Sequence, residues 1–262
     1  MIVIKYGGHV LGDAPANNQI IAAIADFHLQ GGEVLVVHGG GPAIDAELAA
    51  HQIAASTISG YRVTSAAVLE VVQRVLSGTV LRDLVNRFIA HGVNAVGLSS
   101  GDGNTLRAAR FMPTVDGETI DIGLVGEAQS VDPTFLNLLL INGYLPVISP
   151  VAVQSDGVAL NINGDIAAGA IAGALDADEV IFITDVPGIF RDWPDPESLI
   201  EKISLTDLQA ISASFTGGMA PKVRAVTTAL TSGAKQARII DGRSIANLTL
   251  AFQGLGGTVI TA

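Results

Sequence analysis

Short runs of apolar residues alternate along this chain with longer segments whose apolar positions recur at helical spacing. The first run ends on Lys5, helical spacing follows over residues 18–30, and a second apolar run covers residues 34–37. Residues 42–50 then return to helical spacing. Strands of a parallel sheet are apolar throughout because helices cover both of their faces. The start of the chain therefore predicts a β-α-β-α order and a parallel sheet.

The same alternation continues to the end of the chain. It predicts strands at 93–99, 145–149, 179–184, 236–240 and 258–261, and helices at 66–76, 80–91, 132–143, 167–175, 205–213 and 221–232. Residues 106–127 differ, because they have the pattern of antiparallel strands joined at Asp116-Gly117. We find no segment long enough to link independent domains, so we expect one domain with an α/β fold.

Glycines follow the first two strands where each strand should end. Tyr6-Gly7-Gly8 follows Lys5, and Gly39-Gly40-Gly41-Pro42 follows His38. A strand–glycine–helix junction exposes backbone N–H groups at a helix N-terminus, where the helix dipole favours an anion. Ligands of parallel sheets bind beyond the carboxyl ends of the strands. Two such junctions predict one shared site for phosphate or carboxylate, although either junction alone could be a tight turn without a ligand.

Composition narrows the class of protein. The chain has 262 residues, of which 49% are hydrophobic and 15% are charged, so it is large and apolar enough to fold around a core. Its net charge of −11 argues against a nucleic acid or an anionic membrane as partner. It lacks cysteine, which excludes disulfides and thiolate metal sites. Without a secretion signal or an apolar run of about 18 residues, we expect a cytoplasmic protein.

Two lysines could balance the charge of an anionic substrate. Lys5 ends an apolar strand, and Lys222 lies near a predicted helix start after Gly217-Gly218. A cation at a helix N-terminus opposes the helix dipole, so Lys222 is better placed there if it faces a bound polyanion. Ammonium groups over backbone N–H groups suit the oxygens of a transferring phosphoryl group. Each lysine could instead simply be solvated.

Other polar residues are candidates for the same site. Asn161, Asn163 and Asp165 alternate, so their side chains should lie on one side of an extended segment. Asp165 could cap the following helix, or it could organise the two lysines electrostatically. Arg62 could bind a carboxylate through both of its NH groups, or it could be a surface charge. We interpret His38 as a packing or hydrogen-bonding residue, because the histidines are scattered and have no metal-ligand spacing.

Two well-known nucleotide-site motifs are missing. The chain lacks Gly-x-x-x-x-Gly-Lys-Ser/Thr, which argues against a P-loop nucleotide enzyme. The first glycine junction also lacks the Gly-x-Gly-x-x-Gly spacing. A nicotinamide oxidoreductase is therefore the least favoured alternative.

Taken together, short segments spread over nearly the whole chain resemble the amino acid kinase family in order and spacing. These segments are residues 5–8, 37–42, 60–64, 142–147, 161–165, 184–189 and 218–222. Within the family, Gly60-Tyr-Arg-Val-Thr64 resembles the branch that acts on N-acetyl-L-glutamate. The resemblance implies a three-layer αβα sandwich with a mainly parallel, open central sheet. It implies a single domain over residues 1–262, with an acyl-substrate lobe (about 1–160) and a nucleotide-binding lobe (about 161–262).

The activity implied by this resemblance is phosphoryl transfer from ATP to the γ-carboxylate of N-acetyl-L-glutamate, the second step of arginine biosynthesis. Lys5 and Lys222 would stabilise the transferring group, and Asp165 would hold both lysines. The N–H groups of Gly7, Gly8 and Gly40 would face the phosphates or that group. No general base is required, because the attacking carboxylate is already ionised at neutral pH.

The resemblance also implies two groups of binding residues. N-acetylglutamate would contact Gly40, Gly41, Arg62, Asn161 and Asn163. The adenine nucleotide would contact Gly7, Asp185, Val186, Pro187, Gly188, Ile189, Phe190, Ser214, Phe215 and Thr216. Mg²⁺ would arrive with ATP and be coordinated mainly by phosphate and water, without a metal site made by the protein.

The chain departs from the family pattern in a few places. Tyr61 stands where many relatives have leucine, and Gly164 replaces a frequent alanine. The chain starts at its first strand, without the N-terminal helix that links arginine-inhibited hexameric relatives, so we expect an arginine-insensitive homodimer. Two alternatives stay open: a family member that acts on a related acid such as aminoadipate or aspartate, and a non-catalytic sensor of small anions.

Overall fold

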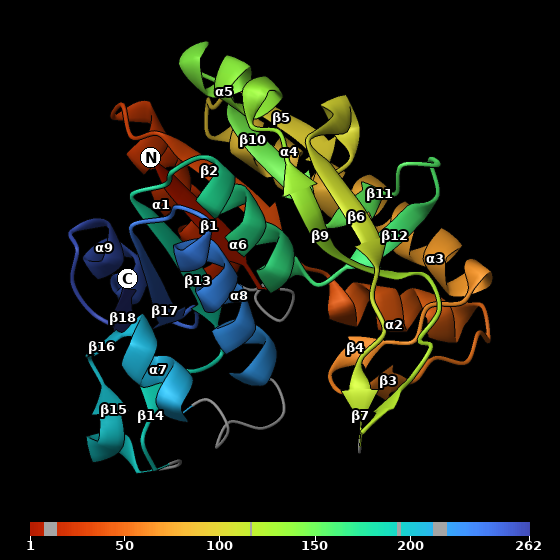
Figure 1. The fold of residues 1–262 in the computed structure, drawn as a ribbon. Coiled ribbons are helices and arrows are strands. Elements are labelled where there is room, and N and C mark those ends of the chain that lie inside the picture. Colours follow the sequence, from red (N-terminus) through yellow and green to blue (C-terminus); the bar gives the residue numbers. More distant parts are fainter. Residues whose placement is uncertain (8–14, 116, 193–194, 212–218) are drawn as a thin grey trace.

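An open sheet of eight strands runs through the middle of the molecule (Figure 1). The structure is a computed structural model and describes residues 1–7, 15–115, 117–192, 195–211 and 219–262. In spatial order the strands are β16 (Lys202–Ser204), β18 (Thr258–Thr261), β17 (Gln236–Asp241), β13 (Glu179–Thr184), β1 (Ile2–Tyr6), β2 (Val34–His38), β10 (Leu145–Ser149) and β5 (Ala95–Ser99). Neighbouring strands are parallel except β17 and β18. The predicted parallel sheet is confirmed.

Apolar side chains of the strands point alternately to the two faces of the sheet and form two separate cores. In β2, Val34 and Val36 join one core, whereas Leu35 and Val37 join the other. The first core is covered by α1 (Pro15–Leu29), α2 (Gly41–Ala50), α3 (Ala66–Gln73), α4 (Leu81–Ala90) and α9 (Ile245–Phe252). The second is covered by α5 (Thr134–Ile141), α6 (Gly164–Ala174), α7 (Leu205–Ile211) and α8 (Met219–Thr231). These layers confirm the expected αβα sandwich.

The carboxyl ends of β1 and β2 meet at one edge of the sheet. The two strands run parallel, with Lys5 beside Val37 and Tyr6 beside His38. The Gly39 N–H donates to the Tyr6 carbonyl at 2.9 Å. Both glycine junctions therefore begin side by side, as the strand pattern predicted.

A small closed barrel lies beside the main sheet. It consists of β6 (Leu106–Arg110), β9 (Val125–Val131), β11 (Val151–Val153) and β12 (Ala159–Ile162), and β6 and β9 are antiparallel as expected. Two hairpins extend from this side, β3 (Thr57–Ile58) with β4 (Tyr61–Arg62) and β7 (Thr114–Val115) with β8 (Glu118–Thr119). Strand β12 spans the expected lobe boundary and pairs with β9 and β11. The division into two lobes stays a prediction.

Some elements differ from the pattern-based prediction. The expected helices 66–76 and 80–91 are continuous, because a π-helical segment (Arg74–Val80) joins α3 to α4. Buried Val75, Leu76 and Val80 hold this segment against the core, which outweighs the helix-breaking tendency of Gly78. The sequence did not predict α9, β11, β16 or the short pair β14 (Ile189–Phe190) and β15 (Leu199–Ile200). Short 3₁₀ turns cover Asp102–Asn104 and Pro196–Ser198.

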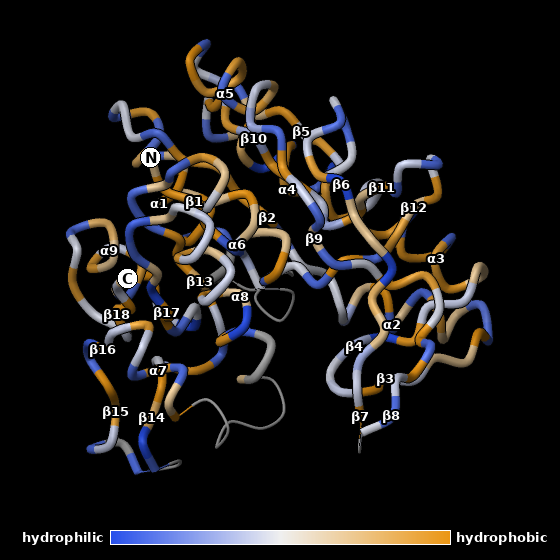
Figure 2. The backbone as a smooth tube through the Cα atoms, viewed as in Figure 1, coloured by the Kyte–Doolittle hydropathy of each residue, from blue (hydrophilic) through white to orange (hydrophobic). Residues whose placement is uncertain are grey.

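One helix leaves part of its apolar face uncovered by the described chain. In Figure 2, α5 is mostly coloured as hydrophobic, and its Leu138 and Ile141 are 58% and 81% exposed. No described helix is long and apolar enough to cross a membrane.

Candidate active site

A cavity of about 340 Å³ opens at the carboxyl edge of the sheet, beside the glycine junction that follows β2. Its walls come from β1, the start of α2, the β3–β4 hairpin, β12, and the first turns of α6 and α8. Eight of the residues predicted from the sequence line it: Lys5, Gly40, Gly41, Arg62, Asn161, Asn163, Asp165 and Lys222. Residues from both ends of the chain thus meet in one space.

Two lysines share a single buried carboxylate at the wall of this cavity. Lys5 Nζ lies 2.8 Å from Asp165 Oδ1, and Lys222 Nζ lies 3.9 Å from Asp165 Oδ2. Burial alone would raise the pKa of the Asp165 carboxyl, but the two ammonium groups outweigh burial and hold this pKa below its usual range. Two ammonium groups and one carboxylate leave one net positive charge, so the cluster can attract an anion.

Asp165 is available to the lysines because another residue caps helix α6. The Asn163 side-chain oxygen accepts from the N–H groups of Asp165 and Ile166 at 2.8 and 3.4 Å. The alternative role of Asp165 as the helix cap is therefore wrong, and Asp165 lies in the first helical turn. Its carboxylate also interacts favourably with the positive end of the helix dipole.

Glycines let the backbone approach the Lys5 ammonium group. A Cβ atom on Gly7 would lie 2.8 Å from the Ile183 carbonyl and 3.7 Å from Lys5 Nζ. A Cβ atom on Gly164 would lie 3.6 Å from Lys5 Cε, and one on Gly40 would lie 2.6 Å from Leu76 Cδ2. At Gly7 and Gly164 the chain therefore places backbone without side chains beside Lys5, which suits a phosphoryl-binding cradle.

Arg62 reaches the cavity from the β3–β4 hairpin and already holds a carboxylate. Its Nη1 lies 2.5 Å from Asp45 Oδ1, on the second turn of α2. The Arg62 side chain is 14% exposed, whereas that of Asp45 is 63% exposed. In the same cavity, the Asn161 amide donates to Thr64 Oγ1 at 3.2 Å, which fixes the orientation of Asn161.

His38 holds the peptide that precedes Gly40. Its ring is fully buried, and Nδ1 lies 2.8 Å from the Gly39 carbonyl oxygen. Burial lowers the pKa of His38 to about 4, so the ring is neutral near pH 7 and donates from Nδ1 to this carbonyl. The Gly39 carbonyl and the Gly40 N–H belong to one peptide plane, so His38 also orients that N–H. The predicted hydrogen-bonding role of His38 is confirmed.

Comparison with known proteins identifies the family. The profile of the "Amino acid kinase family" matches residues 1–241. The chain belongs to the amino acid kinase family. It is 40% identical to the acetylglutamate kinase of Corynebacterium urealyticum, over 98% of this chain and 84% of that protein. It is 41% identical to the acetylglutamate kinase of Methanothermobacter thermautotrophicus, over 99% of this chain and 92% of that protein. The crystal structure of smu.665 from Streptococcus mutans has a TM-score of 0.80 at 28% identity, over 100% of this chain and 98% of that chain.

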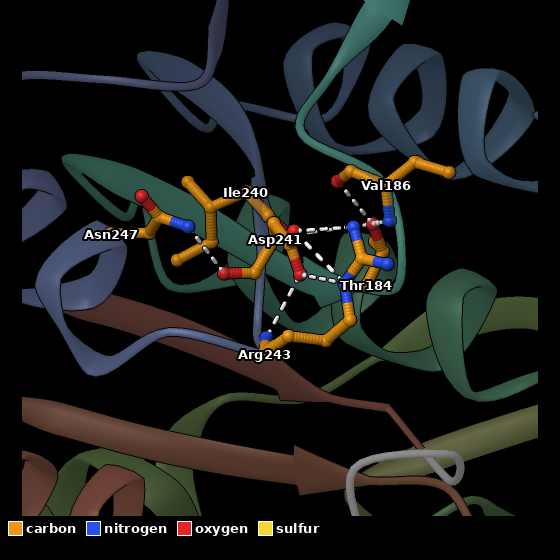
Figure 3. A network of polar contacts seen from close by, with 6 residues as sticks. All are labelled: Thr184, Val186, Ile240, Asp241, Arg243 and Asn247. Atoms are coloured by element: carbon orange, nitrogen blue, oxygen red, sulfur yellow. Dashed lines mark hydrogen bonds and ion pairs between the residues drawn. The ribbon is translucent and has the colours of Figure 1, made fainter. Parts of the chain in front are cut away.

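The loop predicted to hold the nucleotide in this family member follows β13, outside the 340 Å³ cavity. Figure 3 shows its first turn, where the Thr184 hydroxyl accepts from the Val186 N–H at 3.1 Å. Beside it, the Arg243 side chain lies 2.7 Å from Asp241 Oδ2 and lowers the pKa of that carboxyl. The Asn247 amide donates to the Asp241 carbonyl at 2.9 Å and ties α9 to the end of β17.

Part of this loop faces the protein interior. Ile189 is fully buried in the core, and its N–H donates to Thr258 Oγ1 at 2.8 Å. Gly188 is also buried, whereas Asp185 is exposed. Exposure therefore favours Asp185 over Ile189 for contact with a bound molecule. The predicted residues Gly8, Ser214, Phe215 and Thr216 lie outside the described residues.

Sequence reasoning missed several residues that shape the cavity. Leu76, Val125 and Pro150 line it, and Asp45 pairs with Arg62. Leu76 belongs to the unpredicted π-helical segment, so no local pattern could have placed it over Gly40. Asp45 lies one helical turn after Gly41, and this spacing is the one signal that could have suggested it. Among the described residues, no group of three or more His, Asp or Glu side chains could hold a metal ion.

Proposed function

We propose that the chain catalyses ATP-dependent phosphorylation of the γ-carboxylate of N-acetyl-L-glutamate, giving N-acetyl-L-glutamyl 5-phosphate for arginine biosynthesis. Two relatives about 40% identical over nearly the whole chain are named acetylglutamate kinase, which supports this proposal. The observation that carries it is the sharing of Asp165 by Lys5 and Lys222 in a cavity that also contains Arg62.

The charge cluster suits phosphoryl transfer between two anions. Lys5 and Lys222 would neutralise the negative charge that spreads over the transferring oxygens, and Asp165 would keep the two ammonium groups from separating. The low pKa of Asp165 makes it a poor proton acceptor. A base is unnecessary, because the γ-carboxylate of the substrate is ionised near pH 7. Positioning and charge neutralisation would therefore account for most of the rate enhancement.

The acyl substrate would occupy the side of the cavity formed by the hairpin. Arg62 would pair with the α-carboxylate, and Asn161 and the backbone of Gly40 and Gly41 would fix the rest of the molecule. Asp45 already holds Arg62 in place, so the guanidinium does not have to be ordered when the substrate binds.

The backbone around Lys5 fits the phosphate end of ATP. A Cβ atom at Gly7 would lie 3.7 Å from Lys5 Nζ and would clash with the Ile183 carbonyl at 2.8 Å. One at Gly164 would lie 3.6 Å from Lys5 Cε, so both glycines place backbone without a side chain beside Lys5. Residues 185–190 would hold the remainder of the nucleotide at the end of β13. Bound ATP with Mg²⁺ supplies the phosphoryl group, with Mg²⁺ coordinated mainly by phosphate and water.

A coupled assay of ADP release tests this proposal. The purified protein is incubated with ATP, Mg²⁺ and, in turn, N-acetylglutamate, glutamate, aspartate and aminoadipate, and hydroxylamine traps each acyl phosphate as a hydroxamate. We expect turnover with N-acetylglutamate at least about tenfold above that with each other acid. Glutamate, aspartate and aminoadipate carry a positive ammonium group in place of the neutral acetamide, and the cavity already contains Lys5, Lys222 and Arg62. Preference for aspartate or aminoadipate would contradict the substrate assignment.

The Lys222→Ala variant separates a kinase from a non-catalytic sensor. We expect kcat to fall by about 100-fold or more, because Lys222 acts on charge that develops during transfer. Calorimetric affinity for N-acetylglutamate should change little, because Arg62 and Asn161 are intact. Equal loss of affinity and turnover would contradict this role for Lys222.

We further propose that the protein acts in the cytoplasm as a homodimer that arginine does not inhibit. Size-exclusion chromatography with light scattering measures the assembly, and the ADP-release assay with added arginine measures inhibition. A hexamer or strong inhibition by arginine would contradict this part of the proposal.

A further inference from the structure

Arg224 connects α8 to the elements on the opposite side of the cavity. It follows the candidate active-site Lys222 by two residues. Its Nη1 donates to the Tyr61 hydroxyl at 3.2 Å, and its Nη2 lies 2.7 Å from Glu127 Oε2. Its Cζ lies 4.7 Å from the centre of the Phe111 ring. One guanidinium thus contacts β4, β9 and the segment after β6.

These contacts belong to a small core of their own. Tyr61, Ile122 and Val125 form a cluster separate from the two main cores, and Phe111 packs against it. The Tyr61 and Phe111 rings lie 4.7 Å apart at an angle of 47°. This cluster supports the β3–β4 hairpin, which carries Arg62 directly after Tyr61. A change in the hairpin therefore moves the groups that Arg224 contacts.

We propose that Arg224 is a positioning residue that couples the hairpin holding the acyl substrate to the helix holding Lys222. This inference rests on the proposed function. N-acetylglutamate bound to Arg62 adds a contact that stabilises the hairpin further, and Tyr61 and Glu127 transmit this stabilisation to Arg224 and α8. Lys222 is thereby held toward the transferring phosphoryl group before the nucleotide binds. By linkage, bound nucleotide strengthens the binding of N-acetylglutamate by the same factor.

The chemistry of arginine suits this connection better than that of lysine. A planar guanidinium can donate to two partners and stack on an aromatic ring at the same time, whereas an ammonium group cannot keep all three contacts. The ion pair with Glu127 is about half exposed, so it contributes little to stability alone. Its effect should therefore appear in the coupling between the two substrates more than in the stability of the fold.

Calorimetry on the full chain measures this coupling directly. Affinity for N-acetylglutamate is measured with and without saturating β,γ-imido-ATP and Mg²⁺. In the wild type we expect the nucleotide analogue to tighten binding by about tenfold, within the usual range for coupled sites. In R224Q this ratio should fall to within about twofold of one. R224K keeps the positive charge but loses the planar guanidinium with its two donor groups, so it should recover only part of the wild-type affinity ratio.

Two further variants separate coupling from general damage. Y61F leaves Arg224 in place and removes one of its hydrogen-bond acceptors, so it should lower the affinity ratio. The double variant Y61F/R224Q should have a ratio no lower than that of R224Q, because both changes remove the same contact. R110Q is the matched control, because Arg110 lies 2.6 Å from Asp121 in an exposed pair that does not reach α8. It should keep the wild-type ratio.

Several outcomes would overturn the proposal: a wild type whose ratio is one, a wild-type ratio in both R224Q and Y61F, or an equal loss in R110Q. Failure of the proposed function is distinguishable, because the wild type would then bind no N-acetylglutamate or release no ADP with it.

Discussion

The carboxylate of Asp165 lies between two ammonium groups, in a position that is unfavourable for a charge unless its partners stay in place. Its side chain is 7% exposed, and both of its oxygens face a lysine. Removing one member of a buried charge cluster leaves the others without compensation. The effects of single substitutions here should therefore exceed those at exposed ion pairs.

Replacing Asp165 by Asn tests whether the charge of this carboxylate is required, because the substitution exchanges one oxygen for an NH₂ group. The amide keeps the shape but not the charge, so Lys5 and Lys222 repel each other and separate. We expect kcat to fall by about 100-fold or more and the free energy of unfolding to fall by about 3 kcal/mol. Steady-state kinetics and urea denaturation measure both. D178N is the control, because Asp178 pairs with the exposed Lys235 and the amino terminus far from the cavity. A D165N variant with wild-type kcat would contradict the role of the carboxylate.

His38 predicts how stability depends on pH. Burial lowers its pKa from 6.5 to about 4, although the hydrogen bond to the Gly39 carbonyl acts in the opposite direction. Between these values the unfolded chain binds a proton that the folded chain does not, so the free energy of unfolding falls as pH falls. This group should account for a loss of about 3 kcal/mol between pH 7 and pH 4.

Urea denaturation of wild type and H38N at pH 7 and pH 4 checks this value. Asn cannot take up a proton, so H38N should lose less stability over the same interval. H91N, at an exposed histidine, should follow the wild type. Equal losses in H38N and wild type would mean that His38 is not the responsible group.

Helix α6 shows how small residues set the distance between the two halves of the charge cluster. The Ala/Gly-rich pattern predicted close packing against a sheet, but the closest neighbours of Gly169 and Gly173 lie in helix α8 and the residue that follows it. A Cβ atom on Gly169 would lie 2.5 Å from the Ala225 carbonyl, and one on Gly173 would lie 2.4 Å from Ser232 Cβ. Because α6 carries Asp165 and α8 carries Lys222, this close approach keeps the two residues within ion-pair distance.

Gly169→Ala should push these helices apart. The new methyl group meets backbone rather than a flexible side chain, so the helices have to shift, at a cost of about 1–3 kcal/mol in unfolding free energy. Lys222 would then move away from Asp165, and kcat should fall more than the affinity for N-acetylglutamate. Kinetics and thermal denaturation measure the two effects. G78A is the control, because a Cβ there meets nothing within 4 Å, so the protein should be unchanged or slightly more stable. A fully active, equally stable G169A would contradict this explanation.

The elements that could be predicted from the sequence are those with an unambiguous local pattern. Strands such as 179–184 and 258–261 have the predicted bounds, because apolar runs between glycines and polar turns allow few alternatives. The break expected near Gly78 is absent because core packing outweighs local helix propensity. Lys5, Arg62 and Lys222 could be predicted from their neighbours in sequence. Asp45 had only its spacing from Gly41 as a signal, and Arg224 had none. Their partners lie at distant positions of the chain, and only the folded structure brings them together.

At the scale of the whole molecule, the first and last parts of the chain share one sheet. Strand β1 pairs with β2 on one side and with β13 on the other, in register from Ile2 beside Glu179 to Tyr6 beside Ile183. The chain also crosses the expected lobe boundary at β12. This strand pairs with β9 and β11 of the small barrel, directly before the chain enters α6. If the two expected lobes were independent folding units, the pairing of β1 with β13 would have to open without unfolding either lobe.

Native-state hydrogen exchange distinguishes these possibilities. We expect the amides of β1, β2, β13 and β17 to exchange with one common free energy equal to that of global unfolding, because each strand is buried on both faces. The exposed β7–β8 hairpin should exchange much faster and serves as the internal reference. Protection of β13 and β17 that persists after β1 and β2 have exchanged would contradict a single cooperative unit. A common value would mean that Lys5 and Lys222, from opposite ends of the chain, depend on the same cooperative fold, so that neither half alone could assemble the charge cluster.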